Sequence, residues 1–234
     1  MSDTTPVQQS PRRSGIDILI VTAASLVAFA LEILADSTGL VNVGEVARGG
    51  FAVVVGAVAA LAVVRGRGGS WADLGFKRPA RWATVPLWVA GILVAFVVGQ
   101  ILAQQLVSLF IELPEPDFSR YDSIAGNLPA ALALALVLPL TASIPEEIIY
   151  RGFIIGRLEA IFASTTVAPV LAVAVQSILF GLIHFQWGVG GMFVTVILGA
   201  IWGTGYLLCG RNLWIVIMAH SAGHVWFVAQ LYLS

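Results

Sequence analysis

Charged residues are scarce in this chain of 234 residues, since Asp, Glu, Lys and Arg together make up only 11% of it. An ordinary soluble domain carries about 25%. Hydrophobic residues account for 59% of the chain, and the mean hydropathy is +0.94. The composition therefore predicts a membrane protein whose surroundings are the lipid bilayer. A formal net charge of -1 offers no basic surface to nucleic acid, so no such partner is expected.

Cysteine is almost absent. The single thiol, Cys209, excludes a disulfide within the chain and any metal site built from several cysteines. The zinc-protease pattern HExxH is missing, and no internal repeat is visible. No Ser or Cys nucleophile is suggested, so the candidates for chemistry are the carboxylates and the three histidines of the apolar helices.

Long apolar runs are what the sequence does contain. A helix that spans the membrane needs roughly 20 mostly apolar residues. The fold class predicted is an all-α, polytopic transmembrane bundle of about seven spanning helices. The candidate segments are Ile16–Leu34, Val46–Val64, Trp82–Phe110, Leu128–Ser143 with a continuation, Val167–Phe185, Gly190–Leu208 and Leu213–Leu233.

Three regions follow from these segments. The polar residues 1–14 are predicted to form a disordered tail. Residues 15–124 hold the first three helices, and residues 125–234 hold the last four. A cleaved signal peptide is an alternative for the first helix, but its apolar stretch is long and Glu32 and Asp36 follow it without a clear cleavage site. We interpret it as a retained helix.

Basic residues predict the orientation in the membrane. Ten of the twelve fall on one side of a seven-helix arrangement and only Arg48 and Arg120 on the other; the ten are Arg12, Arg13, Arg65, Arg67, Lys77, Arg78, Arg81, Arg151, Arg157 and Arg211. We expect that side to be cytoplasmic, with the N-terminus inside and the C-terminus outside. The composition suggests a bacterial plasma membrane. The segment Trp71–Pro79 between the second and third helices suits an interfacial stretch or a plain basic loop.

Ionisable residues inside a bilayer are costly, so each one suggests a function. Glu147 lies four residues before Arg151, a helical spacing that favours an ion pair. Glu146 points about 100° away from Glu147 and can face a different cavity as a general base. A charged helix end at the membrane surface is the alternative.

The three histidines lie in apolar helices. With a turn at residues 164–166, Glu146 and His184 are equally far from it, about 28 Å along each helix. They would then be level, provided that the fourth helix continues past Pro145. His220 and His224 share one helix face because they are four residues apart. A lone histidine in such a helix is more often a packing residue, but three beside a glutamate pair favour a site.

The run EExxxR at Glu146–Arg151, the run FxxxH at Phe180–His184 and the histidine at His220 resemble the three motifs of the CPBP intramembrane proteases, which include the CAAX-prenyl endopeptidases. The likeness covers roughly residues 125–234, the expected catalytic core. The resemblance implies a helical bundle with a water-filled cavity. It also implies that Glu146 and His184 activate water and that His220 stabilises the oxyanion.

By the same resemblance, Glu147, Arg151 and Phe180 support the site. His224 stands where that family has Asn. A neutral imidazole can donate an N–H to an oxyanion, so catalysis can survive the change. Alternatively, Glu146, His184, His220 and His224 together could bind zinc as in an intramembrane metalloprotease. We favour a site without metal and expect no other cofactor.

The function expected is an intramembrane endopeptidase that hydrolyses a membrane-associated or prenylated peptide. One alternative is a catalytically silent immunity or scaffold protein that binds a peptide in the same cavity. A small proton-coupled transporter ranks last, because no inverted repeat is present. The sequence does not identify the substrate or the oligomeric state.

Overall fold

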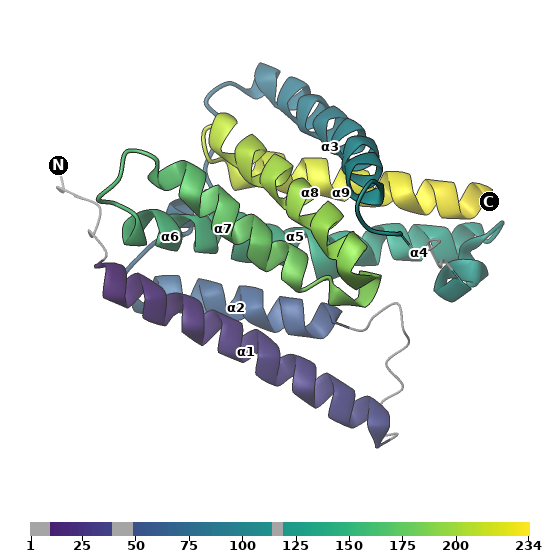
Figure 1. Cartoon of the computed structure of the whole chain (residues 1–234), viewed down its shortest axis with the longest axis horizontal. Coiled ribbons are helices and arrows are strands. Elements are labelled where there is room, and N and C mark those ends of the chain that lie inside the picture. Colours follow the sequence, from purple (N-terminus) through teal and green to yellow (C-terminus); the bar gives the residue numbers. More distant parts are fainter. Residues whose placement is uncertain (1–9, 39–48, 114–118) are drawn as a thin grey trace.

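A computed structural model describes residues 10–38, 49–113 and 119–234, and within these ranges the chain is helical and contains no strand. The α-helices are α1 (Pro11–Ser37), α2 (Gly50–Gly66), α3 (Val85–Ser108), α4 (Leu128–Leu138), α5 (Ile144–Glu146), α6 (Ile155–Ile161), α7 (Ala168–Leu182), α8 (Gly188–Leu208) and α9 (Leu213–Leu233). Short 3₁₀ segments are η1 (Trp71–Leu74), η2 (Trp82–Thr84), η3 (Ser119–Ile124) and η6 (Phe185–Trp187), and π-helical segments are η4 (Pro139–Ser143) and η5 (Glu147–Ile154). Figure 1 shows α7 and α8 beside the run from α4 to α6, with α1 and α2 on one flank and α3 on the other.

The predicted helical membrane bundle is confirmed. Five helical stretches are long and apolar enough to cross a membrane: Pro11–Ser37, Trp82–Ser108, Leu128–Ile161, Phe185–Leu208 and Leu213–Leu233. The other two expected spans, α2 and α7, form apolar helices of 17 and 15 residues. Both are shorter than the roughly 20 residues that a perpendicular span needs. The chain is an integral membrane protein, and two of its seven expected spans are short helices in the described structure.

The prediction of a disordered tail over residues 1–14 extends too far, because residues 11–14 are helical. Helix α1 begins at Pro11, where proline suits the first turn, and the Ser10 hydroxyl accepts the amide of Arg13 as an N-cap. Ser14 is fully buried, which an unfolded tail would not allow. Residues 1–9 lie outside the described ranges, as does Arg48.

The fourth segment continues past Pro145, as the depth argument required. Helical backbone runs without a break from Leu128 to Ile161 and contains both Pro139 and Pro145. The two π-helical segments take up the irregularity that proline imposes inside a helix. Arg151, which we counted in a cytoplasmic loop, is instead fully buried within this run, so that part of the orientation argument is wrong.

Small residues set the contact between α7 and α8. A Cβ atom added at Gly199 would lie 3.1 Å from the Cα of Ser177, and one at Gly203 would lie 2.9 Å from Nε2 of Gln176. Gln176 donates from that nitrogen to the carbonyl oxygen of Gly199 at 2.9 Å. The GxxxG step therefore brings the two backbones close enough for a buried side chain to join them.

The segment after α2 docks onto the bundle. Leu74 is buried, and the backbone turns at Gly75 with a positive φ of 94°. The amide of Leu213 donates to the carbonyl oxygen of Gly75 at 2.8 Å, and the Asn212 side chain donates to that of Lys77 at 2.9 Å. The predicted loop is thus anchored at the start of α9, and its place at the membrane interface stays a prediction.

A buried carboxylate joins three helices at the same end of the bundle. Asp17 of α1 is fully buried and accepts from Arg67, just after α2, at 2.8 Å. Its other oxygen accepts from Nε of Arg157 in α6 at 3.1 Å. Asp17 therefore links the hairpin of α1 and α2 to the helix that continues from Glu146 and Glu147.

The start of α1 and the end of α9 lie at opposite ends of the bundle (Figure 1), as an odd number of passes requires.

We expect a membrane-impermeant thiol reagent to label Cys209 only when the cytoplasmic face is open. Labelling should accelerate from neutral to alkaline pH, because burial raises the pKa of the Cys209 thiol.

The matched control is Ser234→Cys in a Cys209→Ala background, which should react from outside intact cells. Reaction of Ser234→Cys only after the cytoplasmic face is opened contradicts the proposed orientation.

Candidate active site

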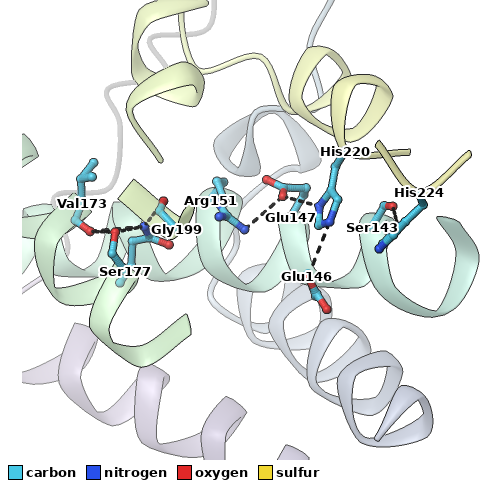
Figure 2. Close-up of polar contacts among 10 residues, drawn as sticks. Ser143, Glu146, Glu147, Arg151, Val173, Ser177, Gly199, His220 and His224 are labelled. Carbon is cyan, nitrogen blue, oxygen red and sulfur yellow. Dashed lines mark hydrogen bonds and ion pairs between the residues drawn. The ribbon is translucent and has the colours of Figure 1, made fainter. Parts of the chain in front are cut away.

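Glu147 is the carboxylate of the site that accepts the most hydrogen bonds. It lies in η5, it is fully buried, and its Oε1 atom accepts from Arg151 at 3.0 Å and from Nδ1 of His220 at 2.8 Å. The ion pair expected from the four-residue spacing is therefore present, and it extends to α9 (Figure 2). A buried charge is tolerated only when it is paired and hydrogen-bonded, which Glu147 and Arg151 achieve for each other.

Glu146 has different surroundings from its neighbour. Its side chain is 12% exposed, and Oε2 lies 4.0 Å from Nε2 of His220, beyond hydrogen-bond length. Adjacent helical residues diverge by about 100°, which explains how one carboxylate is enclosed while the next reaches the edge of the site. Figure 2 shows Glu147 and Glu146 approaching the two different nitrogens of the His220 ring.

Aromatic contacts fix the register between α7 and the glutamate helix. The Phe180 ring lies 5.0 Å from that of Tyr150, and the guanidinium of Arg151 lies 4.6 Å from its centroid. Tyr150 follows Glu146 by four residues and Phe180 precedes His184 by four. In an antiparallel pair this register brings Glu146 and His184 to the same level, as the turn position predicted.

His184 lies just beyond the end of α7 and is partly buried. Its Nδ1 atom is 2.7 Å from the carbonyl oxygen of Phe180, and its ring packs against Phe180 and Trp187. In the described part of the chain it makes no hydrogen bond or ion pair with Glu146. Glu146 and His184 are therefore not in direct contact, and their common level stays a prediction from the register of Tyr150 and Phe180.

His220 and His224 form the α9 side of the site. The His220 ring stacks on Trp202 of α8 with centroids 4.9 Å apart, and the His224 ring lies 4.8 Å from that of His220. Nδ1 of His224 is 2.7 Å from Oγ of Ser143, which is fully buried. The pairs Ser143–His224 and Glu147–His220 are successive contacts of one antiparallel helix pair, four residues apart on each side (Figure 2).

The four proposed zinc ligands do not form a cluster in the described structure. Across the described ranges, no three His, Cys, Asp or Glu side chains are placed to share one metal ion. Nδ1 of each histidine faces a protein oxygen, on Phe180, Glu147 and Ser143 respectively. Zinc-binding histidines commonly bind through Nε2 while Nδ1 is hydrogen-bonded to an oxygen, so these contacts do not decide the question of metal. The zinc alternative stays a prediction, and chelation is its test.

An apolar groove of about 850 Å³ lies elsewhere, between α3 and α8. Its lining includes Trp88, Ile92 and Ile201, and it contains no titratable side chain. None of the residues proposed for catalysis contributes to it, so it is separate from the candidate site.

Two side chains of the site were missed in the sequence. Ser143 sits in a mostly apolar run, where hydroxyls usually bond their own helix, and Trp202 lies in an apolar helix in which we predicted no site residue. The four-residue spacing that links Ser143 to Glu147, matching that of His220 and His224, is the signal that could have indicated Ser143.

Comparison with known families agrees with this geometry. Residues 128–226 match the model described as Rce1-like, type II CAAX prenyl endopeptidase Rce1-like. The match includes Glu146, Glu147, Phe180, His184 and His220. No curated protein and no solved structure matches the chain. Residues 128–226 are thus similar to the CAAX-type intramembrane peptidases, the same family that the motifs at Glu146–Arg151, Phe180–His184 and His220 resemble.

Proposed function

We propose that the protein is an endopeptidase in which Glu146 activates a water molecule against the peptide bond of a membrane-associated or prenylated substrate. The observation that carries this proposal is the unequal environment of two adjacent carboxylates. Glu147 is fully buried and accepts two hydrogen bonds, whereas Glu146 is partly exposed and accepts none in the described structure. A general base needs a free carboxylate within reach of water.

In this mechanism Glu146 takes a proton from the water while the oxygen of the water attacks the carbonyl carbon of the peptide bond. The tetrahedral oxyanion forms beside α9, where the N–H of a neutral His224 can stabilise it, because Nδ1 of His220 is engaged by Glu147. Glu146 then returns the proton to the leaving amine as the C–N bond breaks. His184 lies at the level of Glu146 and helps to orient the water through Nε2, because Nδ1 is engaged by Phe180.

Glu147 and Arg151 hold His220 in place. The carboxylate of Glu147 accepts from Nδ1 at the edge of the His220 ring, and Trp202 stacks on the face of that ring. Both contacts restrict the ring without reaching the substrate, so we assign Glu147 and Arg151 to support. The substrate class follows from family similarity, and we propose the bacterial plasma membrane as the location, with a cytoplasmic N-terminus.

His224 in place of the family Asn also favours a second candidate, a catalytically silent protein that binds a peptide in the same cavity. One experiment separates the two. Purified protein in lipid vesicles is given three peptides: a farnesylated C-terminal CAAX peptide, the same peptide without the lipid, and an unrelated transmembrane peptide.

We expect cleavage of the farnesylated peptide, loss of cleavage in Glu146→Gln, and no effect of a metal chelator. Binding without cleavage by the parent protein supports the silent protein. Cleavage that stops with chelator and returns with added zinc overturns the metal-free mechanism.

A further inference from the structure

The partners of the three histidines determine which ring nitrogen carries hydrogen. Nδ1 of His184 faces a carbonyl oxygen and Nδ1 of His220 faces a carboxylate oxygen. Both oxygens only accept hydrogen bonds, so Nδ1 carries the hydrogen in each ring. In the neutral state, Nε2 of His184 and of His220 is therefore an acceptor.

His224 has a different kind of partner. Nδ1 lies 2.7 Å from a hydroxyl, Oγ of Ser143, which can donate or accept. Other helical hydroxyls in this chain donate to the carbonyl oxygen four residues earlier, as Thr141 does to Val137 and Ser177 does to Val173. In the described structure Ser143 makes no such bond, and its Oγ has His224 as its partner.

The direction of the Ser143–His224 bond follows from burial. Ser143 is fully buried, so its hydroxyl hydrogen cannot reach bulk water. If Nδ1 of His224 donated to Oγ, that hydrogen would be left without an acceptor, and an unsatisfied buried donor is costly. The hydroxyl therefore donates to Nδ1, and the hydrogen of the neutral His224 ring sits on Nε2.

We propose that Ser143 is a positioning residue that fixes His224 in the Nε2–H form, so that this ring supplies a neutral N–H donor to the oxyanion. The inference rests on the proposed function. His224 would then provide what the side-chain amide of the family Asn provides, an N–H group without charge. With Nδ1 accepting from Ser143 and Nε2 protonated, neither nitrogen of His224 is free to bind zinc.

The fold explains why position 143 can do this. Ser143 ends the π-helical segment η4, which begins at Pro139, and the amide of Ile144 donates to the carbonyl oxygen of Pro139. In this wider helical turn the Ser143 hydroxyl contacts His224 of α9 and makes no bond to a carbonyl of its own helix in the described structure. Four residues later Glu147 meets His220 in the same way, so one helix face orients both rings.

A double-mutant comparison tests the proposal in the vesicle assay. Ser143→Ala should lower kcat about tenfold or more, up to the 10²–10³ that loss of one oxyanion donor costs, with little change in KM. In a His224→Asn background, Ser143→Ala should change the kcat of that background by less than about twofold, because the ring that Ser143 orients is gone. Ser177→Ala is the control and should have the same effect in both backgrounds.

The tautomer has its own readout, which does not depend on turnover. In protein labelled with ¹⁵N histidine, the His224 signals are those absent from His224→Asn. They should show hydrogen on Nε2 in the parent and a mixture of the two forms in Ser143→Ala. Hydrogen on Nδ1 in the parent, or equal loss of kcat from Ser143→Ala in both backgrounds, overturns the proposal.

Failure of the proposed function has a different signature. If Glu146→Gln retains the parental cleavage rate, Glu146 is not the base and the mechanism falls. If Glu146→Gln is inactive but Ser143→Ala changes neither kcat nor the tautomer of His224, only the role of Ser143 is wrong.

Discussion

Glu146→Gln should abolish most peptide cleavage while leaving the fold intact. We expect a fall in kcat of about 10²–10⁴, the usual contribution of a general base, because glutamine cannot take the proton from water. The side chain keeps its shape and loses no hydrogen bond found in the described structure, since its nearest partner, Nε2 of His220, is 4.0 Å away. Initial rates in vesicles and thermal melting in detergent measure the two effects.

Glu159→Gln provides the matched control for Glu146→Gln. Glu159 lies in α6 on the same helical run, and its two oxygens accept from Arg211 at 2.7 Å, away from the histidines. Cleavage by this variant should stay near the parental rate. If both glutamine variants lose activity equally, the effect belongs to the helix as a whole and the assignment of Glu146 as the base is wrong.

Glu147→Gln should destabilise the protein, in contrast to Glu146→Gln. The change leaves the guanidinium of Arg151 buried without a counter-charge, and removal of one partner from a buried ion pair costs about 3–5 kcal/mol. His220 also loses the carboxylate that orients Nδ1. We expect lower activity together with a lower midpoint of unfolding in mixed micelles.

Two comparisons isolate the role of the buried charge. Glu159→Gln breaks a more exposed pair with Arg211, where the cost should be about 0–1 kcal/mol. The double variant Glu147→Gln, Arg151→Met removes both charges and should be more stable than Glu147→Gln alone. Equal midpoints for Glu147→Gln and Glu159→Gln would contradict a buried, paired charge at position 147.

Much of the bundle could be predicted because its determinants are local. Apolar runs indicate the helices, and the polar turn at residues 164–166 sets the register that places Tyr150 beside Phe180. The spacing of Glu147 and Arg151 likewise predicts their pair. The limits of the helices were less predictable, because capping by Ser10 and the tolerance of Pro139 and Pro145 depend on packing that the sequence does not display.

The contacts that could not be predicted join distant parts of the chain. Ser143 meets His224 across 81 positions, and Asp17 meets Arg157 across 140. A serine in an apolar helix usually bonds its own backbone, so its sequence context carries no sign of a histidine partner. Only the assembled site determines whether each histidine ring faces a hydrogen-bond donor or an acceptor.

The link made by Asp17 has a consequence for how the protein is assembled in the bilayer. Arg67 follows Asp17 by 50 positions, so both are present once the first hairpin has been inserted, and together they form a neutral pair. Arg157 joins the same carboxylate only after a much longer stretch has been synthesised. An insertion intermediate can therefore hold Asp17 neutralised by Arg67 alone, and arrival of Arg157 marks the step at which the hairpin and the helix carrying Glu146 become one unit.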